Sequence, residues 1–248
     1  MNKPAIFPAN AKVTPGRLYL LPVTLGDDRP EAVLSAEVIR LAQTLDTFVV
    51  ENEKTARRFL SAIKTEKPVR ELSMLLLNEH TTDQELPGLL APLLAGKNVA
   101  IMSEAGCPGI ADPGARLVAL AHQRQIQVLP LVGPSSILLA LMGSGFNGQR
   151  FTFLGYLPID KTQRIKRIQE IEKTSRQQRE TQIFIETPYR NQHLLEDLVA
   201  HCQASTSLCI ACNLTLPEQI ILSRSISAWK NSPLPELHKQ PTVFLLLA

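Results

Sequence analysis

The chain has 248 residues, of which 44% are hydrophobic and 20% charged, a balance typical of a folded protein and not of a disordered one. No apolar run approaches the roughly 20 residues that cross a bilayer, and residues 1–14 lack the apolar stretch of a signal peptide, so we expect a cytoplasmic protein with no membrane partner. The net charge of +3 is too small to indicate a polyanionic partner by itself.

The first half of the chain alternates short apolar runs with segments of helical periodicity. Buried strands are expected at residues 18–21, 47–51, 74–77, 98–102 and 126–131. Helices are expected at residues 53–63, at 115–125, and around Pro30, Leu34, Val38, Leu41 and Leu45. The stretch 82–96 carries Pro87 and Pro92 and is expected to bend or split. Strands that alternate with helices predict a mostly parallel sheet with helices on both faces.

The pattern restarts after Gly133 and differs in its second half. Helices are expected at residues 134–142, 160–180 and 188–202, and Leu194, Leu198 and His201 should share one face of the last. Strands are expected at residues 151–156, 182–186, 208–212, 219–224 and 242–247. Short connections between the last strands predict antiparallel neighbours and a mixed sheet. We therefore predict an α/β protein with a leader (1–14), an amino-terminal domain (15–128) and a carboxyl-terminal domain (129–248).

The loop at residues 103–114 is the most informative segment. It follows a strand and precedes a helix in a parallel sheet, the place where open α/β sheets bind ligands. Its three glycines allow the backbone to approach a ligand closely, and its two prolines stiffen it. Composition is equally compatible with a rigid structural turn.

Four segments in register resemble the tetrapyrrole methylase superfamily, and within it a branch of ribosomal RNA ribose 2'-O-methyltransferases. These segments are residues 103–114, 132–136, 153–158 and 185–190. The resemblance extends over residues 18–247. It implies two α/β domains, a homodimer, and S-adenosylmethionine bound in the cleft between the domains, with direct transfer of its methyl group.

Carried onto this sequence, the resemblance implies a set of cofactor contacts drawn from both halves of the chain. They are Pro22, Val23, Thr24, Ser103, Glu104, Ala105, Gly106, Cys107, Ile110, Ser135, Ser136, Tyr189, Cys212, Asn213, Leu214, Pro241, Thr242 and Val243. Main-chain groups of glycine-rich loops can bind the adenine edge and the amino acid end of such a ligand. Apolar side chains such as Leu214 can face the adenine ring.

Several positions depart from that branch, and they concern the acceptor more than the cofactor. Glu51-Asn52 replaces Glu-Asp, Glu104 replaces an aspartate, and Tyr189 replaces a histidine. At residues 213–216 the sequence Asn-Leu-Thr-Leu replaces Glu-Leu-Thr-Lys, so a pair of charges is lost.

Three side chains are candidates for catalysis: Glu104, Glu51 and His80. A carboxylate in a closed cleft binds protons more readily, and Glu104 could orient the acceptor or accept its proton. Glu104 could equally cap N–H groups of its own loop, and Glu51 and His80, at strand ends, could be structural. Methyl transfer from a sulfonium depends on the alignment of the reacting atoms, so no general base is required.

The acceptor is predicted to be ribosomal RNA or the small ribosomal subunit. Arg57 and Arg58, on a helix beside the expected cleft, are the candidate substrate contacts. A basic series follows residue 160, but Glu170, Glu172 and Glu180 lie on the same stretch and favour a solvated helix face. A tetrapyrrole or other small molecule, and a non-catalytic module that binds the cofactor, remain as alternatives.

The four cysteines are Cys107, Cys202, Cys209 and Cys212, too few for a disulfide framework, and we expect free thiols. Cys209 and Cys212 have the spacing of half a zinc site, which Cys202 and His201 could complete. Because no second pair with that spacing exists and the two lie in a strand pattern, we predict no metal.

Overall fold

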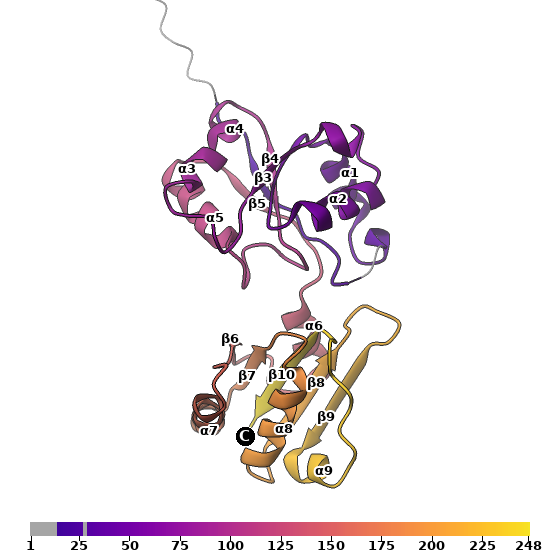
Figure 1. Ribbon diagram of the computed structural model, residues 1–248, viewed down its shortest axis with the longest axis vertical. Helices are drawn as coiled ribbons and strands as arrows, with labels where there is room; N and C mark the ends of the chain where they lie inside the picture. The colour runs from indigo at the N-terminus through magenta and orange to yellow at the C-terminus, as the bar shows by residue number, and fades with distance from the viewer. Residues whose placement is uncertain (1–13, 27–28) are drawn as a thin grey trace, which may run out of the picture. The chain divides into compact units, whose positions relative to one another are not determined.

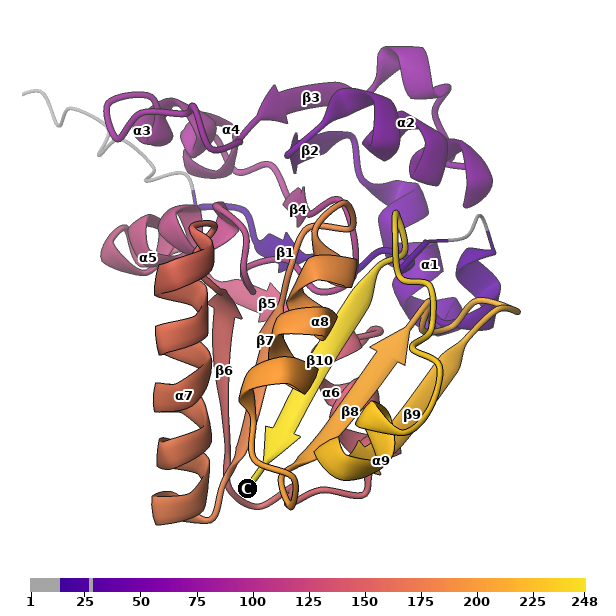
Figure 2. The ribbon, with the colours of Figure 1, turned by 60° about the horizontal axis from the view of Figure 1, so that its bottom comes forward.

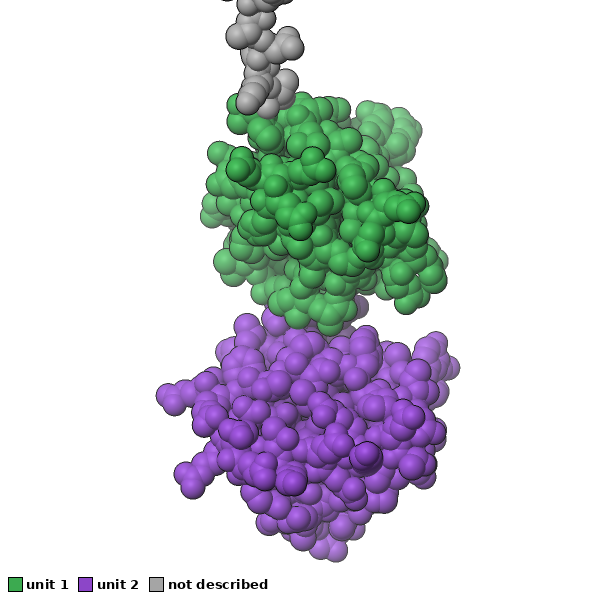
Figure 3. All heavy atoms as spheres, turned by 90° about the vertical axis from the view of Figure 1, so that its left-hand side faces the viewer, with its two compact units in different colours: residues 1–23, 28–133 green, residues 24–27, 134–248 purple. Residues whose placement is uncertain are grey.

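The computed structural model describes residues 14–26 and 29–248, so the expected leader, apart from Thr14, lies outside the described residues. The chain divides into two compact units (Figure 3). Unit 1 consists of residues 1–23 and 28–133, and unit 2 of residues 24–27 and 134–248. This division falls a few residues beyond the boundary suggested by the sequence pattern.

Unit 1 is built on a parallel five-stranded sheet, sheet A (Figure 1). Its strands are β1 (Leu18–Leu20), β2 (Thr47–Val50), β3 (Ser73–Leu76), β4 (Val99–Met102) and β5 (Val128–Pro130). They lie in the order β3-β2-β4-β1-β5, and every neighbouring pair is parallel. β2 and β4 are fully buried, which explains why they appear in the sequence as continuous apolar runs.

Helices cover both faces of sheet A, and the predicted parallel α/β arrangement is confirmed. On one face α1 (Ala36–Thr44) and α2 (Glu53–Ala62) pack on Phe48, Val50 and Met102. The helix expected around Pro30 is in fact a separate 3-10 turn, Pro30–Ala32, and α1 starts only after Ser35, whose side chain caps it.

The other face of sheet A carries α3 (Leu86–Leu89), α4 (Ala91–Leu94) and α5 (Gly114–Gln123), which pack on Leu18, Val49 and Ile101. The stretch 82–96 is split into two short helices, as its prolines predict. A short 3-10 turn at Val69–Glu71 precedes β3 and was not expected from the sequence.

Unit 2 contains a mixed five-stranded sheet, sheet B (Figure 2). Its strands are β6 (Phe151–Tyr156), β7 (Thr181–Ile185), β8 (Ser207–Cys212), β9 (Ile220–Ser225) and β10 (Thr242–Leu247). The order is β6-β7-β10-β8-β9; β6 and β7 are parallel, and the other neighbours are antiparallel. The predicted mixed sheet is therefore confirmed.

The two faces of sheet B are covered unequally. α6 (Ser136–Ser144) packs on one face. α7 (Lys161–Gln178), α8 (Asn191–His201) and α9 (Ile226–Lys230) pack on the other, around Phe184, Phe244 and Trp229 (Figure 2). The expected face of α8 is only partly in the core: Leu194 and Leu198 are buried, whereas His201, in the last turn of α8, is exposed.

Candidate functional site

The strand order of sheet A creates a switch point beside β4. The chain leaves β1 toward α1 on one face of the sheet, and leaves the neighbouring β4 toward α5 on the other face. Loops that depart in opposite directions leave a crevice at the carboxyl ends of such strands, and ligands of open α/β sheets bind there. The 103–114 loop begins at this crevice.

The ends of β1 and β2, the two strands that flank β4, hold the 103–114 loop in place. Val23, just after β1, donates its N–H to the carbonyl oxygen of Gly106 at 2.9 Å. Glu51, just after β2, accepts a hydrogen bond from the N–H of Glu104 at 2.8 Å. The structure thus brings Glu51 to the backbone of the loop, while the side chain of Glu104 itself is exposed.

Asp112 shapes the same loop from within, and sequence reasoning did not single it out. One carboxylate oxygen accepts from the N–H of Gly109 at 2.7 Å and the other from the N–H of Gly114 at 2.6 Å. The bridged backbone takes left-handed conformations at Gly109 and at Ala111, with φ of 85° and 60°. Because Gly114 opens α5, the carboxylate also lies favourably at the positive end of that helix.

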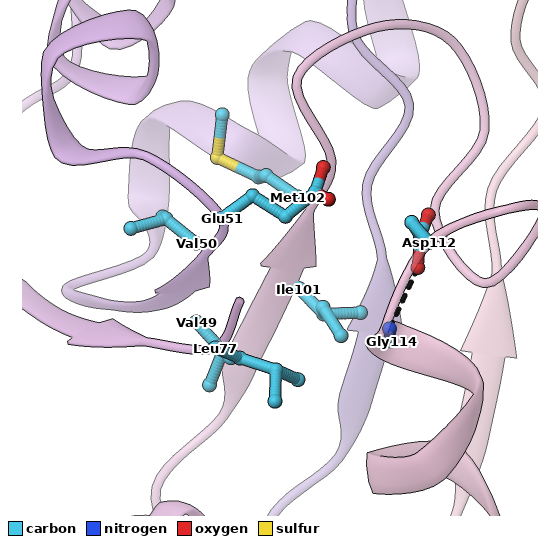
Figure 4. Close-up of a pocket in the computed structure, with 8 residues that line it drawn as sticks. All are labelled: Val49, Val50, Glu51, Leu77, Ile101, Met102, Asp112 and Gly114. Atoms are coloured by element: carbon cyan, nitrogen blue, oxygen red, sulfur yellow. Dashed lines mark hydrogen bonds between the residues drawn. The ribbon is translucent and has the colours of Figure 1, made fainter. Parts of the chain in front are cut away.

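A narrow pocket in unit 1 opens between Glu51 and Asp112 (Figure 4). Its lining residues are Val49, Val50, Glu51, Leu77, Ile101, Met102, Asp112 and Gly114. Apart from these two carboxyl side chains the lining is apolar or glycine, so water solvates them poorly.

The surroundings of the two carboxyl groups change their affinity for protons. Burial raises the pKa of Glu51 above its ordinary value; the hydrogen bond from Glu104 partly offsets this, and the nearby charge of Asp112 adds to it. Burial also raises the pKa of Asp112, against the lowering effect of the loop N–H groups that bond to it. Both groups are thus stabilised in their protonated forms more than an exposed carboxyl would be.

We expect the Glu51→Gln variant to show this effect in the pH dependence of unfolding. The raised pKa means that folded protein holds a proton at Glu51 more tightly than unfolded protein, so this group favours folding below its unfolded pKa of about 4.3. That contribution is lost as pH rises through the folded pKa. The variant keeps an oxygen that can accept from the Glu104 N–H, but its side chain does not bind or release a proton. Its free energy of unfolding, relative to that of the wild type, should therefore rise as pH rises from 4 to 7. Denaturant titrations measure both free energies of unfolding. If the difference between variant and wild type does not change with pH, the raised pKa of Glu51 does not affect stability.

The remaining candidates of unit 1 lie apart from the pocket lining. His80 is 83% exposed in the side chain, and its imidazole lies 3.6 Å from the Glu79 carboxylate. Arg57 donates to the carbonyl of Val69 at 3.2 Å and to Glu53 at 3.0 Å, so its guanidinium is bonded within unit 1, and Arg58 is exposed. Substrate contact by the two arginines and a catalytic role for His80 stay predictions.

The predicted contacts at residues 212–214 and 241–243 lie together at one edge of sheet B. β10 is antiparallel to both β7 and β8, so its start pairs with their ends: Thr242 with Cys212, and Val243 with Ile185. The N–H of Asn213 donates to the carbonyl of Pro241 at 3.0 Å and closes this edge. The segments 212–214 and 241–243, far apart in sequence, are therefore adjacent.

Gln240 joins the segments at this edge, and sequence reasoning also missed it. Its side-chain oxygen accepts from the Asn213 amide at 2.8 Å, and its carbonyl accepts from the Asn191 amide at 2.6 Å. Asn213 has a φ of 51°, a left-handed conformation that asparagine tolerates better than most residues. The departure from the family's glutamate at position 213 thus fits a turn held by amide hydrogen bonds.

Other predicted contacts of unit 2 differ in their environment. Tyr189, after β7, is 66% exposed, and its ring meets His238 edge-on at 6.0 Å. Ser135 caps α6 by accepting a weak hydrogen bond from the N–H of Leu138 at 3.4 Å, and Ser136 is half-buried. Thr24 belongs to the short segment 24–27 of unit 2. Leu214 is buried against α6 and sheet B.

The cysteine pair of β8 points to opposite sides of sheet B. Cys209 packs with the residues around α6, and Cys212 with those around α7 and α8. Burial raises the pKa values of Cys209 and Cys202 to about 12, which keeps both thiols protonated near neutrality. Within residues 14–26 and 29–248, no three His, Cys, Asp or Glu side chains form a group that could hold a metal ion.

No helix in the described part of the chain is both long and apolar enough to span a bilayer.

Comparison with known sequences identifies the family. A model of the tetrapyrrole (corrin/porphyrin) methylases matches residues 18–228. The chain is 35% identical to a Synechocystis protein over 81% of its own length and 67% of the relative. It is 28% identical to a Xylella fastidiosa protein over 94% and 81%, and 31% identical to an Escherichia coli O157:H7 protein over 81% and 66%. All three relatives are named ribosomal RNA small subunit methyltransferase I, and the match spans about two thirds of the length of two of them.

Solved structures agree on the fold. The methyltransferase CobJ superposes with a TM-score of 0.62 at 18% identity, over 94% of each chain. The uroporphyrin-III C-methyltransferase of Thermus thermophilus superposes with a TM-score of 0.54 at 16% identity, again over 94% of each chain. Because the family model extends over most of the sequence and the fold agrees, this chain belongs to the tetrapyrrole (corrin/porphyrin) methylase family and is a methyltransferase.

Proposed function

We propose that this protein transfers the methyl group of S-adenosylmethionine to a ribose 2'-hydroxyl of small-subunit ribosomal RNA. The observation that carries the proposal is the 103–114 loop, fixed at the switch point of sheet A by Val23, Glu51 and Asp112. The shared name of the curated relatives supports the acceptor. The homodimer that the family resemblance implies stays a prediction.

The residues present fit the cofactor. The loop presents residues that a ligand can reach, since Ala105 is exposed and Ile110 is 49% exposed. A Cβ built on Gly109 would meet nothing within 4 Å, so there is open space beside that glycine. In unit 2, Thr215 Oγ1 is buried without a hydrogen-bond partner among the described residues, next to the predicted contact Leu214. Exposed loop residues beside open space can receive a polar nucleoside ligand, and the unpartnered Thr215 hydroxyl is a donor that no described residue uses.

When bound, S-adenosylmethionine supplies a methyl group already activated by its positively charged sulfur. The chain then needs mainly to align the acceptor oxygen with that group, which close positioning can do without a strong base. We assign Glu51 to positioning, because its carboxylate is bonded to the loop backbone at Glu104. The exposed carboxylate of Glu104 is free to face the acceptor.

A tetrapyrrole acceptor is the second candidate, and a module that only binds the cofactor is the third. The name of one structural neighbour, a uroporphyrin-III C-methyltransferase, favours the tetrapyrrole, but at 16% identity this neighbour bears on the fold alone. Curated relatives at 28–35% identity carry the ribosomal RNA name, and we therefore prefer RNA.

The test is transfer of labelled methyl from S-adenosylmethionine to small ribosomal subunits, or to their RNA, from a strain that lacks the gene. We expect label in RNA, stable to alkali at the modified position because the 2'-hydroxyl is blocked. Transfer should fall as salt rises, because phosphate contacts release counterions. Label confined to a small-molecule fraction would reject RNA, and calorimetry without cofactor binding at millimolar S-adenosylmethionine would reject the methyltransferase mechanism itself.

A further inference from the structure

α7 and the residue after it carry more positive charge than the whole chain. Residues 161–179 contain seven Lys or Arg and two Glu, a balance of +5, against +3 for all 248 residues. The sequence pattern alone favours a solvated helix face. The structure divides these charges into an inner set that is paired and an outer set that is not.

The buried charged side chains of α7 form hydrogen bonds and an ion pair with other elements of unit 2. The guanidinium of Arg164 is buried and lies 2.7 Å from the Asp197 carboxylate on α8. Glu172 is buried as well, and its carboxylate accepts hydrogen bonds from the Thr206 hydroxyl and the Gln203 N–H. These groups are occupied within the fold, as a buried charge must be.

The outer face of α7 keeps an excess of cations. Glu170 is the one exposed acid of this helix, and its carboxylate is bonded to Arg167. Lys166, Lys173 and Arg176 are exposed, and none of them forms an ion pair or hydrogen bond with a described residue. We call these three residues the α7 stripe.

Helix geometry aligns the α7 stripe. Its members are separated by seven and by three residues, spacings that return to the same side of an α-helix. At about 1.5 Å per residue they extend over roughly 15 Å, long enough to follow several consecutive phosphates. Lys173 and Arg176, one turn apart, repel each other, so helix stability does not account for the arrangement.

We propose that the α7 stripe binds the phosphate backbone of the RNA acceptor. This proposal rests on the proposed function. RNA is preferred to an anionic membrane because, of the three isoleucines of α7, Ile168 and Ile171 are buried in the core of unit 2 and Ile165 is half-buried. A helix that lies in a lipid surface needs such residues on the outside.

The test compares two variants with equal loss of charge. One is Lys166→Gln with Lys173→Gln and Arg176→Gln, where glutamine keeps a high helix propensity. The control is Arg40→Gln with Lys97→Gln and Arg124→Gln, three exposed cations of unit 1. Binding of small-subunit ribosomal RNA is measured across a potassium chloride series.

We expect the stripe variant to bind the RNA at least about tenfold more weakly near 0.1 M salt. The slope of log K against log salt should become shallower by about 2, since each lost phosphate contact removes roughly 0.7–0.9. The control should change both quantities much less. S-adenosylmethionine affinity should stay at the wild-type value in both variants.

Each other outcome overturns the inference. If both variants weaken RNA binding equally, net charge and not the α7 stripe is responsible. If the stripe variant binds RNA normally but loses binding to phosphatidylserine vesicles, the surface contacts membrane. If wild-type protein methylates RNA and the stripe variant matches it in binding, the proposed function stands without the stripe; if wild-type protein neither binds nor methylates RNA, both fail.

Discussion

The Gly106→Val variant is expected to lose S-adenosylmethionine binding while remaining folded. Gly106 is buried in the loop with a φ of 71°, and its carbonyl accepts the hydrogen bond from Val23. A β-branched residue is a true outlier in this conformation, and the left-handed region costs about 1–2 kcal/mol for an ordinary side chain. The loop can relieve that strain only by turning, which breaks the bond to Val23 and moves the main-chain groups assigned to the cofactor.

The expected loss of affinity is at least about 100-fold, measured by calorimetry. The Gly145→Val variant is the matched control, because Gly145 has a φ of 74° at the end of α6 and a Cβ there meets nothing within 4 Å. It imposes similar strain outside the loop and should bind S-adenosylmethionine normally. Equal loss in both variants would indicate general destabilisation, and full affinity in a folded Gly106→Val protein would show that the loop is misassigned.

The strands were predictable because burial of a strand produces a recognisable run of apolar residues in the sequence. β2 and β4 are buried on both faces and therefore consist of consecutive apolar residues. Short elements without such an apolar run were not predicted. One of them is α9, whose five residues include the buried Trp229 and are too few to show helical periodicity. The start of α1 was also misjudged, because Pro30 suits the first turn of a 3-10 helix as well as that of an α-helix.

The candidate site was predictable where it follows from strand order and from family resemblance. Parallel strands end at one edge, so Glu51 and the 103–114 loop had to be near each other. Asp112 was missed although its contacts are local: aspartate commonly accepts hydrogen bonds from backbone N–H groups a few residues away in turns, here two and three positions away. Gln240 was not predictable, because its contacts depend on where its acceptor atoms lie after folding. Gln240 bonds to Asn213 and Asn191, which are 27 and 49 positions away in sequence, and no local pattern marks such a contact.

The Asp112→Ala variant is expected to weaken S-adenosylmethionine binding by about 10- to 100-fold. The substitution leaves the N–H groups of Gly109 and Gly114 without the carboxylate that aligns them, and hydrogen bonds to charged groups contribute about 1.5–3 kcal/mol each. Burial of the charged carboxylate, which also raises the pKa of Asp112, costs free energy and offsets part of the stabilisation from these hydrogen bonds. The variant should therefore lose little global stability, although its loop loses order. Calorimetry and thermal unfolding measured on the same preparation separate the two.

A graded series makes this test specific to the loop. Asp112→Asn keeps one oxygen acceptor but turns an amide NH₂ toward a backbone N–H, so its affinity should lie between those of the wild type and Asp112→Ala. Asp160→Ala is the control, because Asp160 caps α7 by accepting from the N–H of Gln163 at 2.9 Å and lies outside the loop. It should cost about 1 kcal/mol of stability and leave cofactor affinity unchanged. If Asp112→Ala and Asp160→Ala behave alike, the carboxylate stabilises a helix start and does not shape the cofactor loop. If affinity follows the order wild type, Asn, Ala while the control binds normally, the alignment of the loop N–H groups sets the affinity.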